Sequence, residues 1–115
     1  MKPFTKKLAA YGADVSTALE RFLDDEDLLE NCFMLMLEDE NFLLLKEQIR
    51  NEDYDAAFNS AHALKGVLSN LELTPLLMEV NVLLESLRAK DYSQIKEQQQ
   101  KIEEELERLE MYDLK

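Results

Sequence analysis

One short run of the sequence combines three residue types that could carry chemistry. His62 is the only histidine in the chain, and Lys65 and Gly66 follow it three and four residues later. Residues three and four apart lie next to one another on the surface of a helix, so the imidazole would have a cation and a missing side chain beside it. Histidine titrates near neutral pH, so a ring nitrogen is available as a nucleophile.

The helix that must carry these residues has its buried side elsewhere. Its apolar positions step by three and four residues: Tyr54, Ala57, Ala61, Leu64, Leu68 and Leu71. On a projection of about 100° per residue, His62 lies roughly 130° from the centre of this stripe. We therefore expect an exposed imidazole rather than a core or capping histidine.

Gly66 and Lys65 each have a structural and a functional interpretation. A glycine inside a helix costs about 1 kcal/mol relative to alanine. Close helix packing could explain Gly66, but its distance from the apolar stripe favours access of another protein to the imidazole. Lys65 alone would be an ordinary solvated lysine. Beside His62, its ammonium can stabilise a phosphoryl group, which carries up to about two negative charges.

Other chemistries fit these residues less well. Metal binding by His62 would need further ligands, and Asp55, Asn59 and Ser69 share its face but add only one strong donor. A Ser-His-Asp hydrolase needs a pocket and an oxyanion hole, which a helical protein with two glycines does not readily offer. The sequence has no Gly-rich nucleotide loop, so a phosphoryl group would have to arrive on another protein.

Composition and charge narrow the class of protein. The 115 residues suffice for one domain, and only two glycines and two prolines favour a few long helices. The net charge of −12 argues against nucleic acid and anionic membrane as partners. Residues 20–55 contain 13 acidic and 3 basic side chains. The simpler interpretation is a solvated face that favours solubility, and the alternative is a site for a basic partner.

The lone cysteine and the absence of long apolar runs predict that the protein is located in the cytoplasm. Cys32 lies in an apolar stretch and is predicted to be a buried packing residue in a reducing environment. No apolar stretch reaches the roughly 18 residues of a membrane span, and no apolar signal core follows the N-terminus. We expect a soluble, cytoplasmic monomer.

The N-terminal half predicts four short helices. The first runs from about residue 5 to residue 11 and ends at Gly12, and Asp14 caps the second. The third is expected over residues 25–37 and the fourth over residues 38–50. Their inward residues are expected to be Leu28, Leu29, Phe33, Met36, Leu37, Phe42, Leu45 and Ile49.

Three longer helices follow. Asp53 caps the helix of His62, which should stop between residues 70 and 73. Thr74 is the expected N-cap of the next helix, with Pro75 at its first position, and Asp91 or Ser93 is expected to cap the last. Their core residues are expected to be Leu76, Val80, Leu83, Leu84, Leu87, Tyr92, Ile95, Gln99, Ile102, Leu106 and Leu109.

These elements predict an all-α fold. Long helices joined by short connections pack as antiparallel neighbours. We expect an up-down-up-down antiparallel four-helix bundle over residues 25–112, with short helices in residues 1–23 covering one end. The chain 1–115 would be a single domain.

The residues around His62 resemble the histidine-containing phosphotransfer (HPt) domain family of bacterial two-component phosphorelays. That family's signature is a histidine, any residue, leucine, lysine and glycine, which here is the run from His62 to Gly66. Ala61 and the pair Asn70-Leu71 also resemble its flanking pattern. The family often has a glycine where this chain has Glu72, so Asn70 is expected to adopt the left-handed conformation that ends the helix.

The resemblance implies a relay. The neutral Nε2 of His62 would attack the aspartyl phosphate of a receiver domain in line, and a second receiver would take the group on. Lys65 would stabilise the phosphoryl charge, and Gly66 would give the receiver access. The chain would be a phosphocarrier with no ATP site and no cofactor of its own, the Mg²⁺ belonging to the receiver domain of a response regulator or hybrid kinase.

The receiver is expected to dock on one side of this helix, on Asp55, Phe58, Asn59 and Ser69, with Phe58 as a partly exposed apolar anchor. The alternative is a helical adaptor or inhibitor that binds a receiver or kinase without carrying phosphate. The intact set of His62, Lys65 and Gly66 favours the relay. A metal-dependent hydrolase, the third possibility, would need at least a second histidine.

Overall fold

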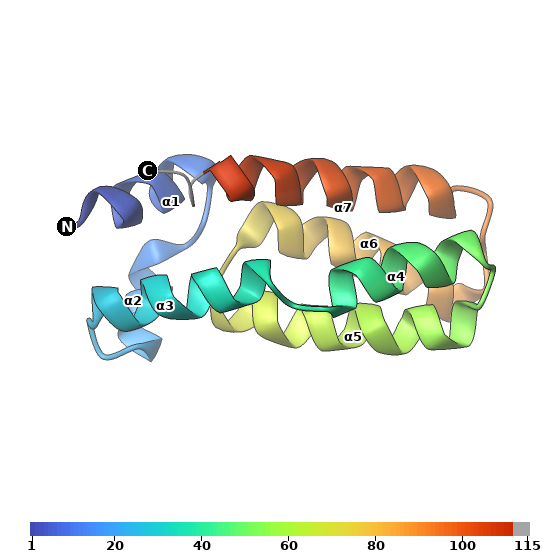
Figure 1. Cartoon of the computed structure of the whole chain (residues 1–115), viewed down its shortest axis with the longest axis horizontal. Coiled ribbons are helices and arrows are strands. Elements are labelled where there is room, and N and C mark those ends of the chain that lie inside the picture. Colours follow the sequence, from blue (N-terminus) through green and yellow to red (C-terminus); the bar gives the residue numbers. More distant parts are fainter. Residues whose placement is uncertain (112–115) are drawn as a thin grey trace.

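The computed structural model describes residues 1–111, and this part of the chain is all-helical (Figure 1). The predicted all-α class is confirmed. The helices are α1 (Pro3–Tyr11), α2 (Val15–Arg21), α3 (Glu26–Leu37), α4 (Asn41–Arg50), α5 (Tyr54–Asn70), α6 (Thr74–Ala89) and α7 (Ile95–Glu110).

Helices α4 to α7 enclose the main core. α5 packs against both α4 and α6, and α7 packs against α6 and α4. Figure 1 shows these four helices side by side, with α1 and α2 at one end of the molecule. The fully buried leucines between them include Leu45, Leu64, Leu68 and Leu83. Burial of each such side chain stabilises the fold by about 1.5–3 kcal/mol, which fixes the inward faces.

Three aspartates begin helices. Asp14, Asp25 and Asp53 precede α2, α3 and α5, and each carboxylate accepts the backbone N–H three residues later. Such an N-cap contributes about 1 kcal/mol. The predicted caps of α2 and α5 are confirmed, and Asp25 caps the third helix rather than being its first residue.

Gly12 ends α1, as predicted. Its φ of 117° is one that residues with a side chain rarely adopt. A Cβ at this position would also lie 3.0 Å from Cγ of Pro75, near the start of α6. Glycine is therefore required twice at this position, by the backbone conformation and by the neighbouring ring.

The junction between α5 and α6 differs from the prediction. Asn70 is the last residue of α5, and Glu72, not Asn70, adopts the left-handed conformation (φ 54°). The Glu72 carbonyl accepts the hydroxyl of Thr74 (3.4 Å). Thr74 therefore lies inside α6 instead of capping it, and Leu73 occupies the N-cap position without a side-chain hydrogen bond.

Arg21 of α2 stabilises this junction. Its guanidinium donates to the backbone carbonyls of Ser69 (3.0 Å) and Asn70 (2.8 Å) and pairs with the Glu72 carboxylate (2.9 Å). The backbone N–H of Asp14 donates to the Glu72 carbonyl (3.0 Å). Because the last carbonyls of a helix have no partners within it, Arg21 satisfies groups that a glycine cap would otherwise serve.

The start of α7 also differs from the prediction. The Asp91 carboxylate accepts the backbone N–H (3.1 Å) and hydroxyl (2.7 Å) of Ser93 in a tight local turn. This turn precedes the helix, which begins at Ile95 after Gln94, with no side-chain cap. Neither Asp91 nor Ser93 is the N-cap, because the Asp91 carboxylate and the Ser93 hydroxyl bond within this turn and not to the first N–H groups of α7.

The third and fourth helices are shorter and less buried than expected. Leu28 is 47% exposed, and Cys32 is half-buried rather than a core residue. Leu37 and Phe42 are half-buried too. α4 begins at Asn41 and not at residue 38, because the Asp39 carboxylate accepts both the backbone N–H (2.8 Å) and the side-chain amide (3.0 Å) of Asn41. This turn separates α3 from α4.

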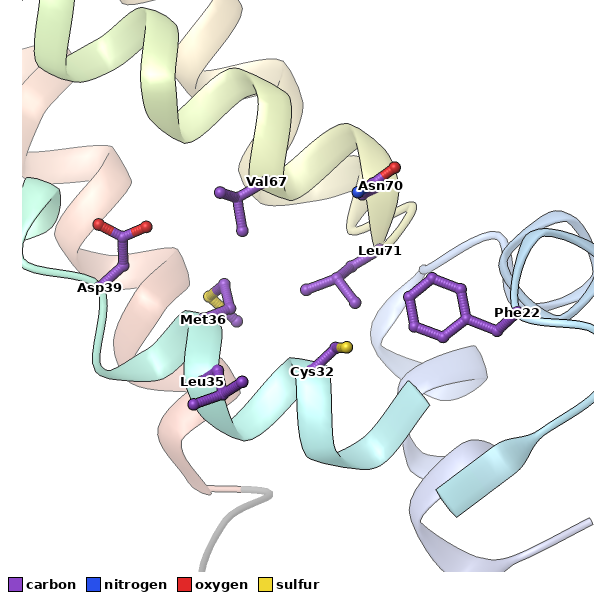
Figure 2. Close-up of a pocket in the computed structure, with 8 residues that line it drawn as sticks. All are labelled: Phe22, Cys32, Leu35, Met36, Asp39, Val67, Asn70 and Leu71. Carbon is purple, nitrogen blue, oxygen red and sulfur yellow. The ribbon is translucent and has the colours of Figure 1, made fainter. Parts of the chain in front are cut away.

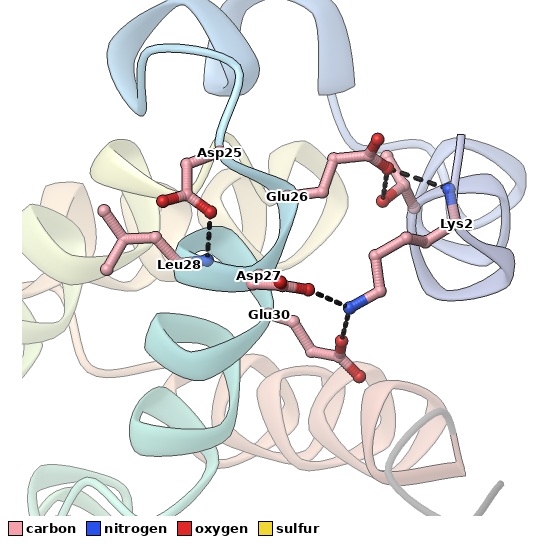
Figure 3. A network of polar contacts seen from close by, with 7 residues as sticks. Lys2, Asp25, Glu26, Asp27, Leu28 and Glu30 are labelled. Atoms are coloured by element: carbon pink, nitrogen blue, oxygen red, sulfur yellow. Dashed lines mark hydrogen bonds and ion pairs between the residues drawn. The ribbon is translucent and has the colours of Figure 1, made fainter.

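A charged network joins α1 to α3 (Figure 3). The Lys2 ammonium donates to Asp27 and Glu30, both at 2.6 Å. The Lys2 backbone N–H (2.9 Å) and the Thr5 hydroxyl (2.6 Å) donate to Glu26. The hydrogen bonds to Asp27 and Glu30 raise the pKa of Lys2, and the bond from Thr5 lowers the pKa of Glu26. All of these bonds favour the ionised forms and hold the N-terminus in place.

Within residues 1–111, no helix is both long and apolar enough to cross a membrane. The predicted end of the bundle at residue 112, and residues 113–115 of the predicted single domain, lie outside the described part of the chain.

Candidate functional site

Helix α5 carries all the residues singled out for chemistry. Its inner face is the predicted stripe, in which Ala57, Ala61, Leu64 and Leu68 are 0% exposed. His62, Lys65 and Gly66 are all exposed. The predicted exposure of the imidazole is therefore confirmed, because the helix turns its small and branched apolar residues toward α4 and α6.

Gly66 is not needed for packing. A Cβ built at this position meets no atom within 4 Å, so the space beside the helix is open. The interpretation that a neighbouring helix requires this glycine is wrong for the free protein. The open space lies one turn from His62, on the same exposed surface of the helix.

Phe58 is the aromatic neighbour of His62. The two rings stack at a centroid distance of 6.1 Å and an interplanar angle of 26°. The Arg88 guanidinium of α6 also lies 5.6 Å from the Phe58 centroid, and it pairs with Glu85. Phe58 thus contacts the imidazole, and Arg88 contacts Phe58 through a cation–π interaction.

Arg88 was not predicted from the sequence to lie near the site. The sequence does contain an indication of this contact. Leu73 lies between α5 and α6, which pack against each other, and Phe58 on α5 is as far from Leu73 along the chain as Arg88 on α6. Antiparallel helices bring such positions to the same level. The predicted direction of α6 could therefore have placed Arg88 beside Phe58.

The predicted docking residues are on α5, with different exposures. Asp55 and Asn59 are exposed, whereas Phe58 and Ser69 are half-buried. The backbone carbonyl of Ser69 is already bonded to Arg21.

The charged and nucleophilic groups on this face are unengaged in the free protein. Among the residues that the structure describes, neither His62 nor Lys65 makes a hydrogen bond or ion pair. An imidazole nitrogen and an ammonium are thus open to a partner on one exposed surface.

A small apolar hollow lies beside the C-terminal half of α5 (Figure 2). It has a volume of about 270 Å³ and opens between α3 and α5. Figure 2 shows Val67 and Met36 facing each other across it, with the Cys32 thiol directed toward Leu71 and Phe22. Its lining includes Val67, Asn70 and Leu71 of α5 and its C-terminal end but neither His62 nor Gly66, so it is separate from the exposed face that carries the imidazole.

Across residues 1–111, no three or more histidine, cysteine, aspartate or glutamate side chains form a group that could hold a metal ion.

A sequence model of the Hpt domain matches residues 13–112, which is most of the chain. The chain belongs to the Hpt domain family. The resemblance seen in the run from His62 to Gly66 is thus confirmed. No curated protein and no solved structure gave a match.

Membership in the family gives the general function. Hpt domains are phosphocarriers, rather than catalysts, in the phosphorelays of two-component signalling, and they interact with receiver domains or kinases. This Hpt domain accordingly serves histidine phosphotransfer. Its sequence contains one histidine, His62, so there is a single candidate for the phosphorylated residue.

Proposed function

We propose that His62 accepts a phosphoryl group from a receiver-domain aspartate and passes it to the aspartate of a second receiver. The observation that carries this proposal is the sole histidine of an Hpt domain standing exposed on α5, one turn from open space at Gly66.

The proposed transfer balances without a further reactant. The lone pair of the neutral Nε2 forms the bond to phosphorus while the bond from phosphorus to the aspartyl oxygen breaks, which returns the aspartate as a carboxylate. Transfer onward is the reverse reaction on the second receiver. The imidazole needs a fixed orientation for in-line attack, and its stack with Phe58 supports that role.

Lys65 is proposed to stabilise the charge of the phosphoryl group. The exposed ammonium has no competing ion pair among the described residues, so it is free to turn toward phosphate on the ring. The Mg²⁺ that such transfers use would belong to the receiver, and we propose that this chain has no ATP site and no cofactor of its own.

The receiver is proposed to land on the outer side of α5, over Asp55, Phe58, Asn59 and Ser69. The half-buried Phe58 would supply apolar contact, and the exposed Asp55 and Asn59 would supply polar contacts.

We also infer that the predicted up-down-up-down antiparallel four-helix bundle of residues 25–112 is formed by α4 to α7, with α3 leading into it, and that the protein is a cytoplasmic monomer. Short connections and the contacts between successive helices support the bundle. The net charge of −12 supports a monomer, because two copies repel each other.

The test is phosphate transfer from phosphorylated receivers to the intact protein and to His62→Gln. The side chain lies off the core, so the variant should have the same helix content and melting temperature. We expect acid-labile phosphate on the intact protein and none on His62→Gln. Phosphate retained by the variant would refute the relay.

The same experiment separates the relay from the adaptor. An adaptor would bind a receiver without ever gaining phosphate, and His62→Gln would leave its binding unchanged. Phosphorylation of the intact protein by any receiver excludes that alternative.

A further inference from the structure

A second hollow lies between α4 and α7. It has a volume of about 500 Å³, and its lining runs from the end of α3 along α4 and along α7 from Gln99 to Glu110. None of its lining residues belongs to α5, the helix of His62. We call this hollow the α4/α7 groove.

The floor of the α4/α7 groove is apolar. Ile102 is buried, and Phe42 and Leu106 are half-buried. Leu43 also lines the groove and is 61% exposed. These side chains present apolar surface that would leave water if a partner covered it.

The rim of the groove is acidic. One cation, Lys46, faces six acidic side chains there, and it lies 3.6 Å from Glu103. The acidic residues are Glu38, Asp39, Glu40, Glu103, Glu107 and Glu110. A surface of this kind favours a cationic partner and repels another copy of a chain that carries a net charge of −12.

Gln99 gives an independent sign that the groove lacks a hydrogen-bond donor. This glutamine lines the groove and is only 6% exposed. Its Nε2 donates to Glu103 (3.0 Å), but its Oε1 is buried with no partner. Buried carbonyl oxygens nearly always have a donor. The wall of the groove therefore holds an acceptor without the donor that such groups usually have.

We propose that the α4/α7 groove binds a basic amphipathic helix of a protein partner. Its apolar side would cover Leu43, Phe42 and Leu106, and its lysines or arginines would meet the acidic rim. The α7 wall from Gln99 to Glu110 is about 16 Å long at 1.5 Å per residue, which matches three turns of a bound helix. Because α5 is not part of the groove, a partner bound there leaves His62 free for a receiver.

The test uses the intact chain and a synthetic Lys/Leu helical peptide of about four turns. Backbone amide NMR shifts are followed during titration at low and at physiological salt. We expect the shifts to concentrate at Leu43, Gln99 and Leu106, the residues of His62 and Gly66 to stay unchanged, and salt to weaken binding. A peptide of equal composition but scrambled order, which has no apolar side, should bind at least about fivefold more weakly.

Two sets of variants examine apolar and charged contacts separately. Leu43→Ser should weaken peptide binding about tenfold, whereas Val82→Ser, which changes an exposed apolar residue on α6, should not. Glu40→Gln with Glu107→Gln should weaken it about fivefold, whereas Glu20→Gln with Asp24→Asn should not. All six residues changed in the two comparisons are exposed, so folding is expected to be retained.

Gln99→Met separates a role in peptide binding from a role in stability. It removes the unpartnered oxygen, so the melting temperature should hold or rise while peptide binding weakens about threefold. The proposal is overturned if the peptide shifts residues evenly over the acidic surface, if Leu43→Ser binds as well as the intact protein, or if sedimentation shows the groove already closed in a dimer of this chain. Phosphotransfer through His62 is measured separately and does not depend on these results.

Discussion

The two glycines mark regions of opposite character. Gly12 lies where α1, α2 and the α5–α6 junction meet, and both its φ and the ring of Pro75 exclude a side chain. Gly66 lies on the open face of α5, where a Cβ would touch nothing. At the first position the fold favours glycine, because any other residue would be strained. At the second the free protein does not favour it, which supports the proposal that this glycine serves the access of a partner.

The surroundings of the two glycines differ in the same way. Around the α5–α6 junction, Arg21 bonds to two carbonyls and a carboxylate. Around Gly66, neither the imidazole of His62 nor the ammonium of Lys65 makes a hydrogen bond or ion pair with the described residues. The difference indicates that side-chain contacts at the α5–α6 junction stabilise the fold. The exposed side of α5 makes few such contacts, and this helix is held in place by its buried stripe.

The largest effect should follow from filling the open face. Gly66→Gln should fold normally yet slow transfer to His62 at least about a hundredfold, or roughly 2.7 kcal/mol in the barrier. Its matched control is Gly66→Ala, which should raise the free energy of unfolding by up to about 1 kcal/mol. Chemical denaturation and transfer rates measure both. A destabilised Gly66→Ala would mean that the two glycines do not differ.

Gly12→Ala should show the opposite sign. A side chain at a φ of 117° and 3.0 Å from Pro75 should lower the free energy of unfolding by about 2 kcal/mol. The melting temperature should fall accordingly, while transfer by the folded protein stays unchanged. An unaltered melting temperature would show that the junction relaxes to accept a side chain.

Arg21→Ala should weaken the same junction by about 1–2 kcal/mol, because the Asn70 carbonyl and the Glu72 carboxylate lose the guanidinium and the Ser69 carbonyl loses one of its donors. Glu72→Gly in that background should recover part of the loss, since glycine tolerates the left-handed φ of 54°. Hydrogen exchange of the last turn of α5 locates the change. If exchange rises equally in α7, the effect is global and not at the junction.

The smallest effect is expected at Lys65. Lys65→Ala should slow phosphotransfer about five- to tenfold, roughly 1 kcal/mol in the barrier, with unchanged or slightly higher helix content. Lys65→Arg should restore most of the rate, because it keeps the charge. Unaltered kinetics for Lys65→Ala across several receivers would show that the ammonium has no part in transfer.

The N-caps predicted from the sequence are correct for α2 and α5 and wrong for α6 and α7, where the side chains concerned bond within the preceding turn. Asp14 and Asp53 cap α2 and α5 as expected. Asp91 bonds within its own turn. Thr74 bonds back to Glu72, and so α6 begins without a side-chain cap. N-cap propensity says which residue types favour a helix start. It does not say which of several nearby donors and acceptors will form a hydrogen bond.

The sequence by itself determined the inner and outer sides of α5, since the period of three and four leaves one side for the core. That periodicity predicted an exposed His62 and a buried Leu64 and Leu68, and both are observed. It also determined the family, because the signature from His62 to Gly66 lies within the matched residues.

Only the tertiary structure decided what meets these helices. It places Arg88 over Phe58, Arg21 on the end of α5, and Gln99 in an acidic groove. It also decided that Gly66 has no neighbour and that Glu72 takes the left-handed conformation. The physical reason is that local periodicity sets which side of a helix is apolar, whereas contacts between distant residues depend on the packing of whole helices.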